Sequence, residues 1–339
     1  MKNFKKKEKI IIIAEAGINH NGKLSKAFKM IDLAARAKAD FIKFQTFVPE
    51  ELSQKDLGLA KYQKKNTYFS SQLKMLKKYQ IKFSDFLKIK KRCKEKKIKF
   101  LSSPFDIKSL KFLSKLNPEF IKIPSGEITN VPLLKKIGKL NKKIILSTGM
   151  SNMQEIKIAM NLLIKNGTSK NKISVLHCCT EYPANIKKLN LNSIKYLKDK
   201  LKCRVGFSDH SKGFEASLLS LALGASIFEK HFTLNKNLPG PDHKSSLSPQ
   251  ELINYVSKIK TFEKSIGLYL KKPYSHELKN SNVIRKKIIA KTKIKAGDVF
   301  SEINLTTKRA RKGIPASMWD KIIGKKSKYS FDYDENITI

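Results

Sequence analysis

Short apolar runs of β-type composition alternate along the chain with amphipathic segments of helical period. In the first intervening segment, Leu24, Phe28, Ile31 and Ala35 fall on one face at a period of 3.6 residues. Eight alternating units favour a closed parallel barrel over an open doubly wound sheet, and no GxGxxG motif follows the first run. The predicted strands are Ile10–Ala14, Phe41–Thr46, Ile98–Ser103, Phe120–Pro124, Lys143–Thr148, Ile173–Cys178, Arg204–Ser208 and Ser226–His231.

Helix-start signals support this reading. Ser151 with Gln154 three residues later predicts a capping box, and the run Ser248-Pro249-Gln250-Glu251 predicts the start of the last barrel helix. Residues 48–82, after the second strand, are too long for a simple connection. We interpret them as an insertion on the face where barrels place active sites.

The barrel pattern stops after residue 262. We predict three parts: a TIM-barrel domain over residues 1–264, a polar linker over 265–284, and a small β-rich domain over 285–339. In the last part, Ile288–Ala290 and Val299–Phe300 resemble the arms of a hairpin around the turn Lys295-Ala296-Gly297-Asp298.

Composition narrows the choice of partners. The formal net charge of the 339 residues is +43, but the lysines are spread over nearly every predicted helix rather than gathered in one stripe. This distribution is typical of a solvated surface, so we expect neither a nucleic-acid nor a membrane partner. The four cysteines form no CxxC pair and no apolar run approaches a membrane span, which predicts a cytoplasmic protein.

Polar and ionisable residues follow the carboxyl ends of the predicted strands, which meet at one mouth in a barrel. In the second and fourth strands, Lys43 and Lys122 stand between apolar neighbours. A buried lysine is unfavourable unless an anion meets it, and parallel barrels have no edges through which these side chains could reach solvent. We therefore predict a cavity for phosphate and carboxylate groups.

His210 and His231 end the two last strands, which are neighbours in a barrel. A pair of imidazoles leaves several positions open on a divalent metal, and this suits a Lewis-acid role. The residues alone do not choose between manganese, zinc and iron.

Nine segments of the barrel form a distinctive set in this order: AEAGINHNG, FIKFQTF, FLSSPFD, IKIPSGEITN, IILSTGM, LHCCTEYPA, VGFSDHS, IFEKHFTL and PGPDHKSSLSP. Taken together, these segments resemble the sialic acid synthase family, whose products are nonulosonic acids. The tail from residue 288 to 309 resembles the family's C-terminal antifreeze-like (SAF) domain, so the resemblance covers nearly the whole chain.

The resemblance implies a role for particular residues. It implies metal binding by His210 and His231, with manganese or magnesium, and acidic catalytic residues at Glu15 and Glu127. It implies a domain-swapped homodimer in which Arg309 reaches the partner's barrel, although Ala310 and Arg311 depart from the family's usual Pro-Gly. Phosphoenolpyruvate contacts are implied for Lys43, Ser103, Lys122, Ser125, Ser147 and Ser208, and sugar-site positions for Gln45, Thr180, Tyr182 and Asp242.

The reaction implied is condensation of phosphoenolpyruvate with an N-acylated mannosamine-type sugar and water, with release of phosphate. We expect N-acetylmannosamine as the sugar and N-acetylneuraminate as the product. The alternative is N,N'-diacetyllegionaminate, made from 2,4-diacetamido-2,4,6-trideoxymannose. Other readings are a phosphoenolpyruvate-dependent 3-deoxy-aldulosonate synthase or a basic nucleic-acid binder on a barrel scaffold.

Overall fold

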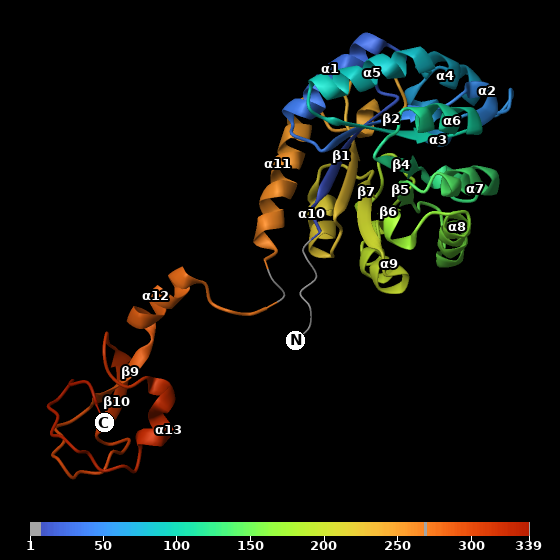
Figure 1. Cartoon of the computed structure of the whole chain (residues 1–339). Helices are drawn as coiled ribbons and strands as arrows, with labels where there is room; N and C mark the ends of the chain where they lie inside the picture. The colour runs from blue at the N-terminus through green and yellow to red at the C-terminus, as the bar shows by residue number, and fades with distance from the viewer. Residues whose placement is uncertain (1–7, 268–269, 339) are drawn as a thin grey trace. The chain divides into compact units, whose positions relative to one another are not determined.

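The computed structural model describes residues 8–267 and 270–338, and the chain divides into two compact units, Met1–Gly267 and Leu268–Ile339. Outside the described residues lie residues 1–7 and 339 of the expected domains and residues 268–269 of the expected linker. In the first unit eight strands alternate with helices (Figure 1). The strands are β1 (Ile11–Gly17), β2 (Phe41–Thr46), β3 (Lys99–Pro104), β4 (Phe120–Ile123), β5 (Lys143–Ser147), β6 (Ile173–Cys178), β7 (Arg204–Asp209) and β8 (Ile227–His231).

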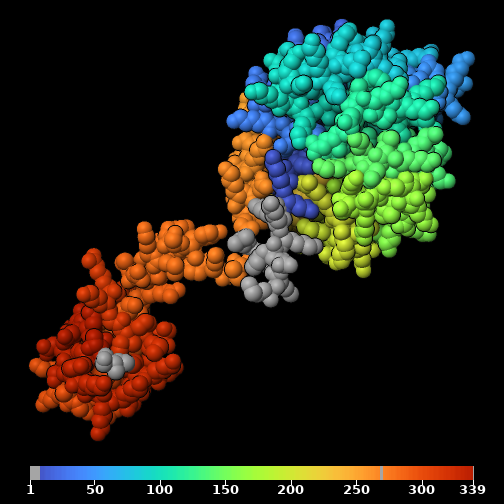
Figure 2. Space-filling view, viewed as in Figure 1, coloured from blue at the N-terminus to red at the C-terminus, as the bar shows by residue number. Residues whose placement is uncertain are grey.

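All of these strands pair in parallel, in the order β3-β2-β1-β8-β7-β6-β5-β4, and contact between β3 and β4 completes the ring. The predicted α/β barrel is therefore confirmed. Successive segments follow one another round the visible surface of this unit, from cyan through green to yellow (Figure 2). The main barrel helices are α1 (Leu24–Arg36), α5 (Phe83–Glu95), α6 (Ile107–Lys115), α7 (Val131–Lys139), α8 (Met153–Lys165), α9 (Ser193–Leu201), α10 (Glu215–Ala222) and α11 (Pro249–Ser265).

The interior of the barrel changes character along its axis. One inward layer is apolar and consists of Ile13, Phe41, Leu101, Phe120, Ile145, Leu176 and Ile227. Because strand side chains alternate, the next inward layer lies two residues further toward the carboxyl ends. That layer is polar and consists of Glu15, Lys43, Ser103, Lys122, Ser147, Cys178 and Glu229. The packed floor thus supports a polar mouth.

Two helix starts test the capping signals. At α11, the Glu251 carboxylate accepts from the Ser248 amide at 2.7 Å, which confirms the predicted box. At α8, the predicted cap residue, Ser151, is one residue too early. Asn152 is the cap, because its side chain accepts from the Glu155 amide at 3.0 Å while Glu155 accepts from the Asn152 amide at 2.8 Å. Glu at the third helical position completes the box, which Gln154 does not.

The insertion over residues 48–82 is largely helical. It contains α2 (Pro49–Leu52), α3 (Lys61–Asn66) and α4 (Gln72–Tyr79). A separate cluster, with Phe47, Leu59, Met75 and Tyr79 among its buried members, gives this segment its own small core. No helix in the described residues is long and apolar enough to cross a membrane.

The second unit is a small antiparallel β structure with its own core around Ile288, Phe300 and Phe331. The predicted hairpin is wrong for one of its two strands. Strand β9 (Lys286–Ala290) pairs with β10 (Leu305–Arg309), whereas Val299 forms an isolated bridge with Lys326. The predicted turn is present, with the Asp298 amide donating to the Lys295 carbonyl at 3.1 Å. The expected linker also contains a helix, α12 (Ser275–Ile284), which has no buried residue, and a short helix, α13 (Trp319–Ile322), follows β10.

Candidate active site

The polar layer of the barrel holds a network of buried charges. Lys43 Nζ lies 3.0 Å from Glu15 Oε2, 3.6 Å from Glu229 Oε1 and 3.3 Å from Ser103 Oγ. All three charged side chains are at most 6% exposed. Alternation along β2 therefore turns Lys43 inward, as predicted. The structure also gives Glu229 a central place that the sequence analysis did not assign to it.

Lys122 approaches the same carboxylate from the other side of the barrel. Its Nζ donates to Ser147 Oγ at 2.7 Å and lies 3.8 Å from Glu229 Oε1. Ser208 Oγ donates to this oxygen at 3.2 Å. Glu229 therefore joins the two lysines through one oxygen, while its other oxygen, Oε2, is buried without a hydrogen-bond partner. The signal for Glu229 was its spacing, two residues before His231 on the inward face of the same strand.

Burial and mutual attraction set the protonation of this network. Burial raises the pKa of Glu15 to about 7, against the attraction of Lys43. Burial alone would lower the pKa of Lys43, but Glu15 and Glu229 raise it above its ordinary value. Burial lowers the pKa of Lys122, and the two lysines hold the pKa of Glu229 down against burial. Two lysines thus face one carboxyl group whose ionised form is favoured and one that takes up a proton more readily than usual, an arrangement able to receive an anionic ligand.

The two predicted metal ligands lie side by side at the mouth. The ring centroids of His210 and His231 are 5.7 Å apart. His210 Nδ1 donates to the Cys179 carbonyl at 2.7 Å, because a carbonyl can only accept. In the neutral ring this bond leaves the Nε2 lone pair available. His231 Nδ1 is buried without a hydrogen-bond partner.

These side chains fit a divalent metal. Burial lowers the pKa of His210 to about 4 and that of His231 well below its ordinary value, which favours the neutral rings that metal ligation requires. In the described residues no group of three or more His, Cys, Asp or Glu side chains is arranged to hold an ion. A metal held by these two imidazoles alone would keep its remaining coordination positions open for other groups.

An aromatic wall adjoins the histidines. The ring of Tyr182 stacks on His210 with centroids 4.2 Å apart, and Tyr62 of α3 packs on Tyr182 at 5.1 Å. The carboxylate of Asp242 interacts electrostatically with both tyrosines, and burial raises its pKa to about 7. Sequence reasoning missed Tyr62, because only the folding of the insertion brings it to this wall. Gln45 joins the site through Glu15 Oε1, to which its amide donates at 3.5 Å.

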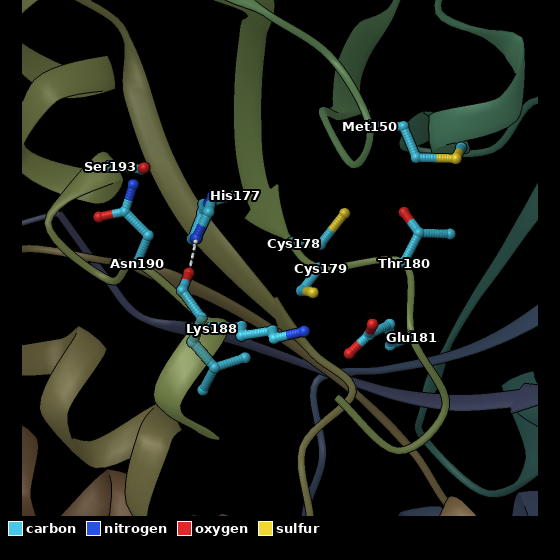
Figure 3. Close-up of a pocket in the computed structure, with 10 residues that line it drawn as sticks. Met150, His177, Cys178, Cys179, Thr180, Glu181, Lys188, Asn190 and Ser193 are labelled. Carbon is cyan, nitrogen blue, oxygen red and sulfur yellow. Dashed lines mark hydrogen bonds between the residues drawn. The ribbon is translucent and has the colours of Figure 1, made fainter. Parts of the chain in front are cut away.

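A cavity of about 350 Å³ lies at the end of β6 (Figure 3), and its lining includes Cys179, whose carbonyl accepts from His210. Cys178, Thr180 and Met150 are among its lining residues. Cys178 Sγ lies 3.1 Å from Ser125 Oγ, which accepts from the Gly149 amide at 2.9 Å. Ser125 and Thr180 are therefore placed in this corner of the mouth.

Two further candidate residues stand apart from the charged network. Glu127 accepts a hydrogen bond from Asn130 at 2.6 Å, and burial raises its pKa. Its carboxylate is thus held by a neighbour on its own loop. Arg309 is the last residue of β10 in the second unit and is exposed. Its expected role stays a prediction.

Comparison with known families identifies the chain. The NeuB family profile matches residues 30–271, and the SAF domain profile matches residues 285–338. The chain belongs to the NeuB family. This confirms the expectation of a phosphoenolpyruvate-dependent nonulosonic acid synthase, which is a transferase, with a C-terminal SAF domain. Members of the NeuB family are generally metal-dependent.

Individual relatives refine this picture. The N,N'-diacetyllegionaminic acid synthase of Campylobacter jejuni is 48% identical over 97% of this NeuB chain and 99% of that protein. The human N-acetylneuraminate-9-phosphate synthase is 30% identical over 96% of this chain and 90% of that protein. Among solved structures, N-acetylneuraminic acid synthetase from Leptospira borgpetersenii has a TM-score of 0.73 at 35% identity, covering 84% of this chain and 96% of that one. The Campylobacter jejuni relative carries in its name the product that the sequence analysis gave as the alternative, N,N'-diacetyllegionaminic acid.

Proposed function

We propose that this NeuB protein is an N,N'-diacetyllegionaminate synthase. It condenses phosphoenolpyruvate with 2,4-diacetamido-2,4,6-trideoxymannose and water, and releases phosphate. The observation that carries the proposal is the 48% identity, over almost the full length of both chains, to a relative with this activity in its name. A second relative of that name, from Legionella pneumophila, is 37% identical over 93% of this chain and 89% of its own.

The charged network supports placing phosphoenolpyruvate at Lys43 and Lys122. Their ammonium groups approach Glu229 from two sides, and each also contacts a serine hydroxyl at Ser103 or Ser147. An incoming phosphate and carboxylate would take over these contacts, and buried cations bind such anions strongly. We place Ser125 and Ser208 at the edges of the same anion site.

The histidines and the aromatic wall support placing the sugar next to it. A divalent ion, manganese or magnesium, held by His210 and His231 would polarise the sugar aldehyde toward attack by C3 of the enol phosphate. Tyr182 and Asp242 would hold the acylated sugar, with Gln45 and Thr180 at its borders. Glu15, whose pKa lies near 7, and Glu127 are candidates for moving the proton of the water that adds at C2.

Substrate profiling tests this function. Phosphate release is measured with N-acetylmannosamine, its 2,4-diacetamido-6-deoxy analogue and simple aldose phosphates, with mass detection of the nine-carbon acid. We expect the diacetamido sugar to give the highest kcat/KM, because the mouth offers aromatic faces suited to acetyl and deoxy groups. Preference for N-acetylmannosamine would restore the neuraminate reading, and turnover only with aldose phosphates would overturn both.

We also propose a domain-swapped homodimer in which Arg309 of one copy contacts the sugar in the other copy's barrel. Mixed dimers test it. We expect Arg309→Ala and His210→Ala each to be nearly inactive alone. In a mixed dimer, the barrel of the Arg309→Ala chain keeps its own His210 and receives Arg309 from the His210→Ala chain. Recovery of activity on mixing supports the swap, and no recovery in a mixed dimer verified by mass contradicts it.

A further inference from the structure

Behind the two histidines, the outer faces of β7 and β8 carry a buried ion pair. Lys230 Nζ lies 3.0 Å from Asp209 Oδ2, and the two side chains are 1% and 0% exposed. Asp209 directly precedes His210, and Lys230 directly precedes His231. Since neighbouring side chains along a strand point to opposite faces, the ion pair faces the outer helices while the imidazoles face the mouth.

The hydrogen bonds of this pair converge on the residue that follows His210. Asp209 Oδ1 accepts from Ser211 N at 2.8 Å and from Ser211 Oγ at 2.6 Å, and Lys230 Nζ donates to the Ser211 carbonyl at 2.6 Å. His210 is thus tied down on both sides, at residues 209 and 211. The ammonium that ties residue 211 comes from the strand that carries His231.

Helix α10 fixes the pair from outside. Ser217 Oγ donates to Asp209 Oδ2 at 2.7 Å and lies 3.2 Å from the Tyr255 hydroxyl of α11. The carboxylate therefore has four partners, which is the satisfaction a buried charge needs. A well-packed apolar pair of similar volume is often as stable as a buried ion pair, or more so. Stability alone therefore does not explain why charged residues occupy these two positions. The hydrogen bonds that both side chains make to residue 211 do explain it.

We propose that Lys230 and Asp209 are positioning residues for the metal-binding histidines. The pair sets the distance and direction between His210 and His231, because its bonds join the end of β8 to both neighbours of His210. The proposal rests on the metal role proposed for these histidines. It assigns the pair no contact with substrate.

The test measures Mn²⁺ binding to the full-length protein without substrate, by the electron paramagnetic resonance signal of the free ion. The variants are Lys230→Met, the double variant Asp209→Leu/Lys230→Met, and Ser217→Ala. The control is Lys236→Met, because Lys236 forms an exposed pair with Glu251 at 2.8 Å on the same barrel. Thermal unfolding, followed by circular dichroism, defines the folded range for each protein.

We expect the Mn²⁺ Kd to rise about 10- to 100-fold in Lys230→Met, as for other residues that orient metal ligands. The double variant leaves no unpaired charge, so it should be folded and yet still bind Mn²⁺ weakly. Ser217→Ala, which deletes one hydroxyl, should show a smaller rise in Kd, and Lys236→Met none. A purely structural pair would lower the unfolding temperature but leave the Kd of the folded protein unchanged.

Failure of this inference can be told apart from failure of the metal assignment. His210→Ala should abolish Mn²⁺ binding. If it binds as the wild type does, the metal role of His210 is wrong. If His210→Ala loses binding but the folded double variant keeps the wild-type Kd, the positioning role is overturned. If the double variant does not fold, Ser217→Ala takes its place in this comparison.

Discussion

Lys43 Nζ lies 3.0 Å from Glu15 Oε2 inside the barrel, and both side chains are almost completely buried. A charge in this position depends on its partners, because burial shields it from bulk solvent. The anion-binding proposal depends on this relationship, since the ammonium that now faces Glu15 and Glu229 would face the substrate in the complex.

Replacing Lys43 by Met should therefore weaken phosphoenolpyruvate binding strongly. We expect kcat/KM for phosphoenolpyruvate to fall at least ~30-fold, since truncating a buried charge partner costs about 2–5 kcal/mol. Steady-state kinetics check this. Lys77→Met is the control, because Lys77 pairs with Glu50 on the surface, where both side chains are more than half exposed. Equal kinetics for the two variants would argue against an anion site at Lys43.

Tyr62 should contribute to the affinity for the sugar. Its ring packs on Tyr182 at 5.1 Å, and Tyr182 in turn stacks on His210. Tyr62→Ala removes an aromatic contact of about 0.5–1.5 kcal/mol, so KM for the amino sugar should rise ~3- to 10-fold with KM for phosphoenolpyruvate unchanged. Tyr68 is fully exposed on the same insertion and serves as the control. Equal KM values for Tyr62→Ala and Tyr68→Ala would remove Tyr62 from the sugar site.

Asp242 predicts a dependence of stability on pH. Burial raises its pKa to about 7 from 3.8, so between these values the folded protein binds a proton that the unfolded chain does not. The stability contributed by this proton is complete below about pH 4 and is lost as the pH rises to 7. The unfolding temperature of the wild type should therefore fall relative to that of Asp242→Asn between pH 5 and 7, and the difference should level off above pH 7.5. A difference independent of pH would show that Asp242 does not titrate there.

Gly149 should tolerate no side chain. A Cβ at this position would clash first with Thr180 Oγ1 and would lie 2.9 Å from both Cys178 Sγ and Ser125 Oγ, closer than real Cβ atoms approach. Gly149→Ala should push Thr180 and Ser125 from their places, raise KM for both the sugar and phosphoenolpyruvate, and cost about 1–3 kcal/mol of stability. Kinetics and thermal unfolding measure both effects. Gly58→Ala, which meets nothing within 4 Å, should change neither.

Local sequence determined the barrel and most of its mouth. Short apolar runs and cap residues depend on neighbours in the chain, so the eight strands and the start of α11 could be predicted closely. Alternation within a strand also fixed that Lys43 and Lys122 turn inward. Where two local signals competed, as at Ser151 and Asn152, side-chain hydrogen bonds decided the outcome.

Only the tertiary structure decided which side chains meet. Glu229 bridges lysines from two different strands, Tyr62 reaches Tyr182 from the insertion, and β9 pairs with β10 rather than with the segment nearer in sequence. Each of these contacts joins residues far apart in the chain, and its free energy comes from burial and charge pairing that exist only after folding. The sequence by itself therefore specified the elements and their inward faces, and tertiary folding selected the partners.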